Sequence, residues 1–374
     1  MNHAGGPVCI KDLETIARGV MPSGAWGYYD SGANDEQTKY SNLSAFDEYR
    51  LHPRYLRDVS TVSTETTVLG QRVKTPLGVA PCAMHKLAHA DGELATSRAA
   101  SGHGSIMILS TYATASLEKV IAEGDGSTQY WMQLYVYRER RVSEAIVRRA
   151  EKAGFKALVL TVDAPVLGRR LIDARNKFNP PDDLVLENFA QDKESKTFGA
   201  LFGANGDQSL SWENGVAWLQ SITKLPIIVK GILTKEDTEL AIKYGCAGVI
   251  VSNHGGRQLD GALSSIDALP QVVAAAQDKL EVYMDGGIRR GTDIFKALAL
   301  GARAVFVARP VLWGLAYKGE RGVRHALGLL QKELELTMML TGTTSIEQID
   351  RSFVYQPVNR WVRYNKRGEL VAKL

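Results

Sequence analysis

Polar side chains follow the ends of five apolar runs in the sequence. The runs cover residues 157–162, 225–229, 247–251, 281–284 and 304–307. The residues after them are Asp163, Lys230, Ser252, His254, Asp285 and Arg309. If the runs are strands of a parallel barrel, their carboxyl ends share one face, and enzymes of that kind keep their active sites there. We therefore expect these carboxylate, amine, imidazole and guanidinium groups to meet in one site.

Two segments suggest what the site binds. In residues 252–258, His254 and Arg257 stand three apart around Gly255 and Gly256. Histidine accepts a proton near neutral pH, and an arginine fork binds a carboxylate at two points. Residues 285–290 and 301–310 place glycines and arginines after the last two runs, where a barrel usually holds a phosphate. The sequence thus predicts a base, a carboxylate site and a phosphate site.

The elements that must position these groups alternate along the chain. Three earlier apolar runs, at 77–80, 105–109 and 130–136, bring the expected strands to eight. Amphipathic stretches at 142–153, 234–244 and 292–300 lie between later runs and each ends at a glycine, as helices often do. This alternation predicts an α/β fold of the (β/α)8 TIM-barrel type.

The expected domain organisation is a single domain over residues 1–374. Residues 1–75 form an N-terminal extension, with a helix at 10–18 and a turn-rich stretch at 28–34, and residues 76–374 form the barrel. After the fourth strand, residues 178–214 are polar and rich in Gly, Asp and Asn. A loop of that length in a compact enzyme is often a mobile lid.

Composition excludes several other classes. The 374 residues are 45% hydrophobic with a net charge of +4, and the basic residues are scattered, so nucleic-acid binding has little support. No apolar run approaches the roughly 18 residues that span a bilayer. Three separated cysteines predict neither disulfides nor a zinc site. The final residues, Ala372, Lys373 and Leu374, have the form of a peroxisomal address, so the expected location is peroxisomal or cytoplasmic.

The order of motifs resembles the FMN-dependent 2-hydroxy-acid oxidase family, which includes glycolate oxidase, lactate oxidase and the flavin domain of flavocytochrome b2. The motifs run from Tyr-Tyr-Asp-Ser-Gly-Ala at 28–33, through Gln-Leu-Tyr at 133–135, to Ala-Arg-Pro at 308–310. The resemblance implies FMN as cofactor and oxidation of an L-2-hydroxy acid (lactate, glycolate or a longer analogue) to the 2-oxo acid. It further implies oxygen as electron acceptor, hydrogen peroxide as product, and a homotetramer or octamer.

The resemblance also implies roles for single residues. His254 would be the base, oriented by Asp163. The substrate would be bound by Tyr28, Tyr112, Tyr135, Arg170 and Arg257, with Tyr135 also taking part in catalysis. Isoalloxazine and ribityl contacts would come from Pro81, Cys82, Ala83, Ser110, Gln133, Thr161 and Ser252, with Lys230 beside the pyrimidine ring. The ribityl-phosphate end would be held by Asp285, Gly287, Arg289, Ala308 and Arg309.

Three positions depart from the pattern of glycolate oxidase. Cys82 stands where a Thr is usual, Ala308 where a Gly is usual, and Tyr112 where a Trp lines the substrate pocket. The smaller ring of Tyr112 leaves more room than Trp would, which makes lactate or a longer 2-hydroxy acid at least as good a candidate as glycolate.

Other functions stay open at this point. The same half-reaction could deliver electrons to a quinone or cytochrome, which would make the protein a dehydrogenase. A catalytically silent flavin-binding or scaffold protein would stay yellow with every 2-hydroxy acid. A phosphate-binding barrel isomerase or aldolase would be colourless.

Overall fold

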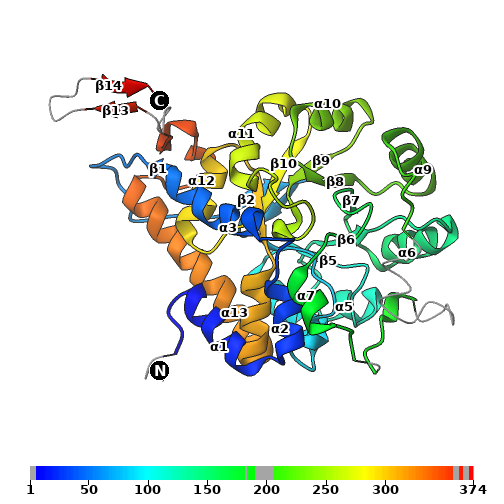
Figure 1. The fold of residues 1–374 in the computed structure, drawn as a ribbon. Coiled ribbons are helices and arrows are strands. Elements are labelled where there is room, and N and C mark those ends of the chain that lie inside the picture. Colours follow the sequence, from blue (N-terminus) through cyan, green and yellow to red (C-terminus); the bar gives the residue numbers. More distant parts are fainter. Residues whose placement is uncertain (1–5, 182, 190–205, 357–361, 365–369, 374) are drawn as a thin grey trace.

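Eight parallel strands form a closed barrel in a computed structural model that describes residues 6–181, 183–189, 206–356, 362–364 and 370–373 (Figure 1). β11 pairs with β4 to close the barrel, with Val305 opposite Leu77. The barrel strands are β4 (Leu77–Val79), β5 (Met107–Leu109), β6 (Tyr130–Leu134), β7 (Ala157–Thr161), β8 (Ile227–Ile232), β9 (Gly248–Val251), β10 (Glu281–Asp285) and β11 (Ala304–Val307). The predicted α/β barrel and its eight strands are confirmed.

The strands form because both of their faces are covered. All residues of β6, β7 and β9 are buried, so their sequences are mostly apolar, with Gln133 and Thr161 as the polar exceptions, and do not alternate. Inside the barrel, Trp131, Tyr283 and Phe306 pack edge to face or tilted against one another. A hairpin of β2 (Thr66–Val68) and β3 (Gln71–Val73) adds Val68 and Val73 to this interior cluster. It covers the end opposite the polar strand ends.

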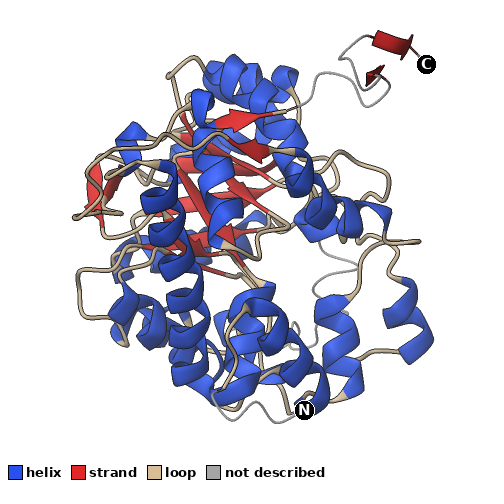
Figure 2. Cartoon of the chain, turned by 90° about the vertical axis from the view of Figure 1, so that its left-hand side faces the viewer, coloured by secondary structure: helices blue, strands red, loops and turns tan. Residues whose placement is uncertain are grey.

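Helices surround the barrel on the outside (Figure 2). They are α4 (Gly92–His103), α5 (Leu117–Ala122), α6 (Arg140–Ala153), α7 (Leu171–Asn176), α9 (Ala217–Ile222), α10 (Lys235–Lys243), α11 (Ser265–Ala276), α12 (Gly291–Ala299) and α13 (Arg309–Thr341). The expected glycine ends are present: Gly154 follows α6 with φ of 95°, and Gly301 follows α12 with φ of 102°. The shorter turns are η1 (Ala45–Glu48), η2 (His85–Leu87), η3 (Glu187–Phe189), η4 (Trp212–Val216), η5 (His254–Gly256), η6 (Ile346–Gln348) and η7 (Arg351–Phe353).

The α-helices of the N-terminal extension are α1 (Ile10–Val20), α2 (Ser23–Asp30) and α3 (Gln37–Ser44), packed against the barrel. The turn-rich stretch predicted at 28–34 is wrong in its first part, because Tyr28 and Asp30 belong to α2. Aromatic packing decides this local structure. Trp26 stacks on Trp313 of α13 at 4.5 Å between ring centroids, which favours a helix despite the two glycines within it.

Some predictions fall partly outside the described residues. In the long polar loop, residue 182 and residues 190–205 lie outside the described residues, so the mobile lid stays a prediction. The remaining strands pair as two antiparallel two-stranded sheets, β1 (Arg50–Leu51) with β12 (Val354–Tyr355) and β13 (Val362–Tyr364) with β14 (Leu370–Lys373). Leu374 is not described, and the peroxisomal address and the oligomer likewise stay predictions. No described helix is long and apolar enough to cross a membrane.

Candidate active site

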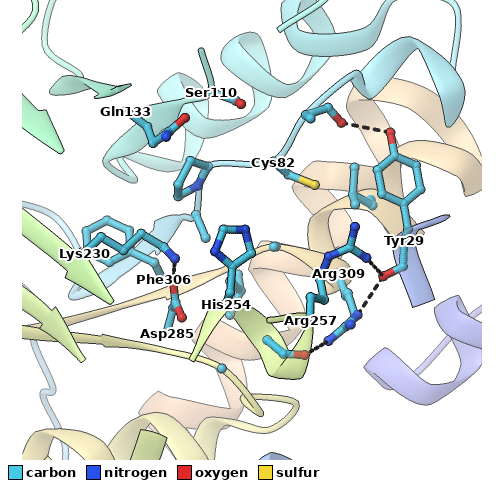
Figure 3. A pocket seen from close by; sticks show the side chains of 18 of the residues that line it. Tyr29, Cys82, Ser110, Gln133, Lys230, His254, Arg257, Asp285, Phe306 and Arg309 are labelled. Atoms are coloured by element: carbon cyan, nitrogen blue, oxygen red, sulfur yellow. Dashed lines mark hydrogen bonds and ion pairs between the residues drawn. The ribbon is translucent and has the colours of Figure 1, made fainter. Parts of the chain in front are cut away.

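A cavity of about 960 Å³, open to solvent, lies at the carboxyl ends of the barrel strands (Figure 3). Most of the predicted site residues line it. They are Tyr28, Pro81, Cys82, Ala83, Ser110, Tyr112, Gln133, Tyr135, Thr161, Arg170, Lys230, His254, Arg257, Asp285, Gly287, Arg289, Ala308 and Arg309. Asp163 and Ser252 stand behind the cavity wall, where Asp163 contacts His254 and Ser252 contacts Lys230.

His254 and Asp163 form a closely packed pair at the ends of β9 and β7. Nδ1 of His254 lies 2.8 Å from Oδ1 of Asp163. Burial acts to raise the pKa of Asp163, but the neighbouring His254 and Lys230 outweigh it and hold that pKa below its usual value. Since an ionised carboxylate only accepts hydrogen bonds, Nδ1 carries the proton and Nε2 is left as an acceptor.

The imidazole itself is neutral at physiological pH. Burial lowers the pKa of His254, and the charges of Lys230 and Arg170 lower it further, while Asp163 opposes them. The net shift is downward from the ordinary value near 6.5. A neutral imidazole beside an ionised carboxylate can take up a proton and have the resulting charge stabilised.

The backbone that carries His254 is unusual. His254 has φ of 58°, followed by Gly255 at 66° and Gly256 at 74°. A non-glycine residue in the left-handed region is strained unless its surroundings hold it there. Here Asn42 of α3 and Asn253 exchange two amide hydrogen bonds, each 2.8 Å, and Oδ1 of Asn253 accepts from the Gly256 N–H at 3.0 Å. The N-terminal extension therefore fixes the loop that presents His254.

Lys230 is a buried cation at the end of β8. Its Nζ lies 2.9 Å from Oγ of Ser252 and 3.4 Å from Oδ2 of Asp285, and Figure 3 shows the lysine and the aspartate side by side. Burial acts to lower the pKa of Lys230, but Asp285 and Asp163 outweigh it, so the pKa is raised. Lys230 thus stays charged at the floor of the cavity.

Two arginines anchor the end of α2. Arg309 donates to the carbonyl oxygens of Tyr29 at 2.9 Å and Ser31 at 3.1 Å, and Arg257 donates to those of Tyr28 and, at 3.2 Å, Tyr29. The last carbonyls of a helix lack partners within the helix and carry partial negative charge, so cations suit them. The arginines therefore attach the N-terminal extension to the cavity rim.

Four arginines that line the cavity give it positive charge: Arg170 is buried, and Arg257, Arg289 and Arg309 are half-buried. Burial and the neighbouring Arg257 and Arg289 lower the pKa of Arg309 to about 9, and burial and Arg257 lower that of Arg170 to about 10. Among the described residues, Arg170 alone of these four has a carboxylate within ion-pair distance, Asp173 at 3.9 Å. Crowded cations of this kind favour the binding of anions, which would supply the missing countercharge.

Three tyrosines complete the polar wall. The ring of Tyr28 lies beneath Arg257, 4.9 Å from the guanidinium carbon, and Tyr112 and Tyr135 lie 5.3 Å apart. Burial raises the pKa of Tyr28, Tyr112 and Tyr135, so all three hydroxyls keep their protons. They can donate hydrogen bonds to an anionic ligand.

Sequence reasoning missed several lining residues. They are Tyr29, Ala80, Gly255, Gly286, Ile288, Phe306, Val307, Pro310 and Leu312. Most are direct sequence neighbours of predicted residues, so adjacency was the available signal. Among these residues, Tyr29 connects two parts of the cavity wall. Its hydroxyl donates to the Met84 carbonyl at 2.6 Å and so links α2 to the segment that contains Cys82. Ala308, a departure from the glycolate oxidase pattern, has φ of −108°, which an alanine adopts without strain.

Taken together, these features define a (β/α)8 barrel whose cavity holds an imidazole–carboxylate pair and a group of arginines and glycines suited to anions such as a carboxylate and a phosphate. The comparisons with known proteins agree. The model of the family described as FMN-dependent dehydrogenase matches residues 17–356. The chain belongs to this family.

Individual relatives span nearly the whole chain. It is 47% identical over 357 residues to 2-hydroxyacid oxidase 1 of Homo sapiens, covering 93% of this chain and 96% of the relative. It is 49% identical over 356 residues to glycolate oxidase of Spinacia oleracea, covering 92% and 95%. A solved structure of mandelate oxidase with (S)-2-phenylpropionate superimposes with a TM-score of 0.85 at 41% identity, covering 94% of this chain and 98% of that one.

The prediction of FMN as cofactor is confirmed by the family, and the residues present fit it. The backbone from Ala80 to Ala83 and the strand end at Val307 offer an apolar wall for a flat ring system. The Gln133 amide is held in place, with Oε1 accepting from the Thr111 N–H at 3.0 Å and Nε2 donating to Thr161 at 3.0 Å. At the far end, half-buried Arg289 stands beside Gly286 and Gly287, which have φ of 100° and 83°. Such a glycine-rich turn with a guanidinium suits a phosphate.

Proposed function

We propose that the protein oxidises an L-2-hydroxy acid to the 2-oxo acid and passes the electrons to oxygen. In the balanced reaction, one hydroxy acid and one O₂ give one oxo acid and one H₂O₂. The observation that carries this proposal is the shared cavity: it is lined by His254, which Asp163 contacts from behind, by the two arginines at 170 and 257, and by buried Lys230. The relatives named glycolate oxidase and 2-hydroxyacid oxidase support it.

The substrate carboxylate would be bound by Arg170 and Arg257. Both guanidinium groups lie near the Tyr28 ring, at 6.0 and 4.9 Å from its centroid, so they converge on one part of the cavity. Tyr28 and Tyr135 would donate hydrogen bonds to the carboxylate or hydroxyl. A compound without the carboxylate would leave buried cations without countercharge, which makes the site selective for acids.

The proton would be removed by Nε2 of His254. Asp163 holds Nδ1–H at 2.8 Å, fixes the tautomer and stabilises the imidazolium that forms. Because the pKa of His254 is lowered, the base is deprotonated and ready at neutral pH.

FMN bound in the cavity would supply the two-electron acceptor for the substrate. Lys230 would lie beside its pyrimidine ring, with Asp285 and Ser252 holding the ammonium group in place. A fixed positive charge there stabilises negative charge that develops on the ring. Arg289 and Arg309 would hold the phosphate end, and Cys82, Ser110 and Thr161 would contact the ring and ribityl chain.

We also propose that residues 1–374 act as one functional domain. The extension supplies Tyr28 to the cavity wall, and Asn42 supports the loop of His254. A barrel without the extension would lack both contacts.

A panel of L-2-hydroxy acids tests the function. Glycolate, lactate, 2-hydroxybutyrate and mandelate are supplied in air, and both 2-oxo acid and peroxide are measured. Equal amounts of oxo acid and peroxide are expected. Turnover with an artificial dye but without peroxide would replace the oxidase by the dehydrogenase alternative, and no turnover with any acid or acceptor would overturn the proposal.

A further inference from the structure

A second cavity of about 1190 Å³ adjoins the first. Tyr112, Tyr135 and Thr161 line both cavities, so their side chains form the wall between them. Much of the rest of its described lining is apolar: Val136, Leu160, Val162, Pro165, Leu210, Trp212, Val216 and Ile232. The polar residues of this lining are Asp207, Gln208, Ser211 and Asp237. The wall that contains Tyr112 therefore has a second, partly apolar cavity behind it.

The position of Tyr112 is fixed from outside both cavities. Oη of Tyr137 donates a hydrogen bond to Oη of Tyr112 at 2.8 Å. Tyr137 is buried, its N–H donates to Ser143 of α6 at 2.9 Å, and its ring packs edge-on against Phe189 at 5.6 Å. Phe189 also stacks with Tyr112, at 6.0 Å. Tyr137 is thus firmly held and lines neither cavity, and it holds the hydroxyl of Tyr112, which lines both.

The wall at Tyr112 limits the space for the substrate because the substrate carboxylate would be held in one place. Arg170 and Arg257 would fix the carboxylate, so a longer side chain must be accommodated elsewhere in the cavity. Rotation of the Tyr112 ring would join the two cavities and give an apolar side chain room. The Tyr137 hydrogen bond opposes that rotation.

We propose that Tyr137 is a positioning residue that sets the size limit of the substrate, by holding Tyr112 as a wall in front of the second cavity. Short 2-hydroxy acids fit with the wall in place, and a bulky apolar one such as mandelate requires Tyr112 to move. This inference rests on the proposed function, because it concerns the substrate of that same site.

The test compares Tyr137→Phe with the wild type on L-lactate and (S)-mandelate. The substitution removes one hydroxyl and keeps the ring. The ratio of kcat/KM for mandelate to that for lactate is expected to rise about two- to tenfold, the range for loss of one hydrogen bond. The change should lie mainly in the KM for mandelate, with lactate kinetics nearly unchanged.

A matched control is Tyr130→Phe. Tyr130 is also a buried tyrosine, its hydroxyl pairs with Ser97 at 2.7 Å, and it lines neither cavity. Its loss perturbs the barrel by a similar amount but leaves Tyr112 in place. The control should leave the mandelate-to-lactate ratio at the wild-type value.

Two further measurements show whether Tyr137 acts through Tyr112. In a Tyr112→Phe background the hydrogen bond is already absent, so adding Tyr137→Phe should not change the ratio again. Titration of the holoenzyme with pyruvate and benzoylformate, followed by flavin absorbance, should show tighter benzoylformate binding relative to pyruvate in Tyr137→Phe.

The outcomes separate the two proposals. If wild-type protein oxidises no 2-hydroxy acid, the proposed function fails. If it oxidises lactate but Tyr137→Phe leaves the ratio unchanged or lowers it, only the positioning role is overturned. The same holds if Tyr130→Phe matches the effect, or if the effect persists in the Tyr112→Phe background.

Discussion

Replacing Asp163 by asparagine removes one negative charge beside His254 and keeps a hydrogen-bond acceptor in its place. The amide can present either its oxygen or its NH2 group to Nδ1, so the substitution also weakens control of the tautomer with a free Nε2. What disappears is the charge that stabilises the imidazolium formed when the base takes up a proton. The substitution therefore tests both functions of the contact, which spans 2.8 Å between Nδ1 and Oδ1.

The expected size follows from Coulomb's law. With these atoms in contact, the two charge centres lie about 4 Å apart, and at an effective dielectric of about 20 the attraction is about 4 kcal/mol. The retained hydrogen bond offsets part of this loss. We expect kcat to fall about 10²- to 10³-fold, since about 1.4 kcal/mol corresponds to a tenfold change in rate. FMN content should be unchanged.

The pH dependence of activity provides a second, independent test of the role of Asp163. Asp163 raises the pKa of His254 against the effects of burial and Lys230, so its loss lowers that pKa further. A base works only when deprotonated, and activity is lost as pH falls through its pKa. The acid limb of kcat/KM against pH should therefore move to lower pH in Asp163→Asn.

The assay is the rate at which flavin absorbance bleaches on anaerobic mixing with L-lactate, measured between pH 4.5 and 8. Asp267→Asn is a matched control, because Asp267 caps α11 through Ser264 and does not line the cavity. It should bleach at the wild-type rate. A rate for Asp163→Asn within tenfold of wild type, or an acid limb that moves to higher pH, would refute the role given to the pair.

Three more predictions concern the base, the phosphate end and the support of the loop. His254→Ala should remain yellow while turnover falls about 10²- to 10⁴-fold, and near-normal turnover would contradict the base assignment. Arg289→Ala should weaken FMN binding about 10- to 100-fold, seen as FMN fluorescence released on dilution, and wild-type retention would argue against a phosphate contact. Asn42→Ala breaks the amide pair with Asn253. It should destabilise the fold by about 1–3 kcal/mol, visible as a lower Tm, and should lower kcat more than FMN affinity; an unchanged kcat would contradict support of the His254 loop.

Much of the barrel could be predicted from the sequence because its strands are buried on both sides. The run at 304–307 matches β11 residue for residue, and the other barrel strands agree within about two residues at most ends. The polar residue after each run pointed to the site because the barrel brings all the carboxyl ends together. Lys230, His254 and Asp285 were found in this way.

Contacts that depend on packing between distant segments could not be predicted. Asn42 lies 211 residues before Asn253, and nothing in its local sequence indicates an amide pair with the loop of His254. The helical state of Tyr28 depends on Trp26 stacking against Trp313. The hydrogen bond from Lys230 to the Ser252 hydroxyl could not be predicted either, because it depends on the direction of both side chains.

The most direct test of a single cavity that unites base, substrate arginines and FMN is the visible spectrum of the purified protein under anaerobic conditions. The protein should be yellow, and its flavin absorbance should bleach when an L-2-hydroxy acid is added. A colourless preparation that takes up no FMN, or a yellow one that keeps its colour with every L-2-hydroxy acid tried, would contradict the account.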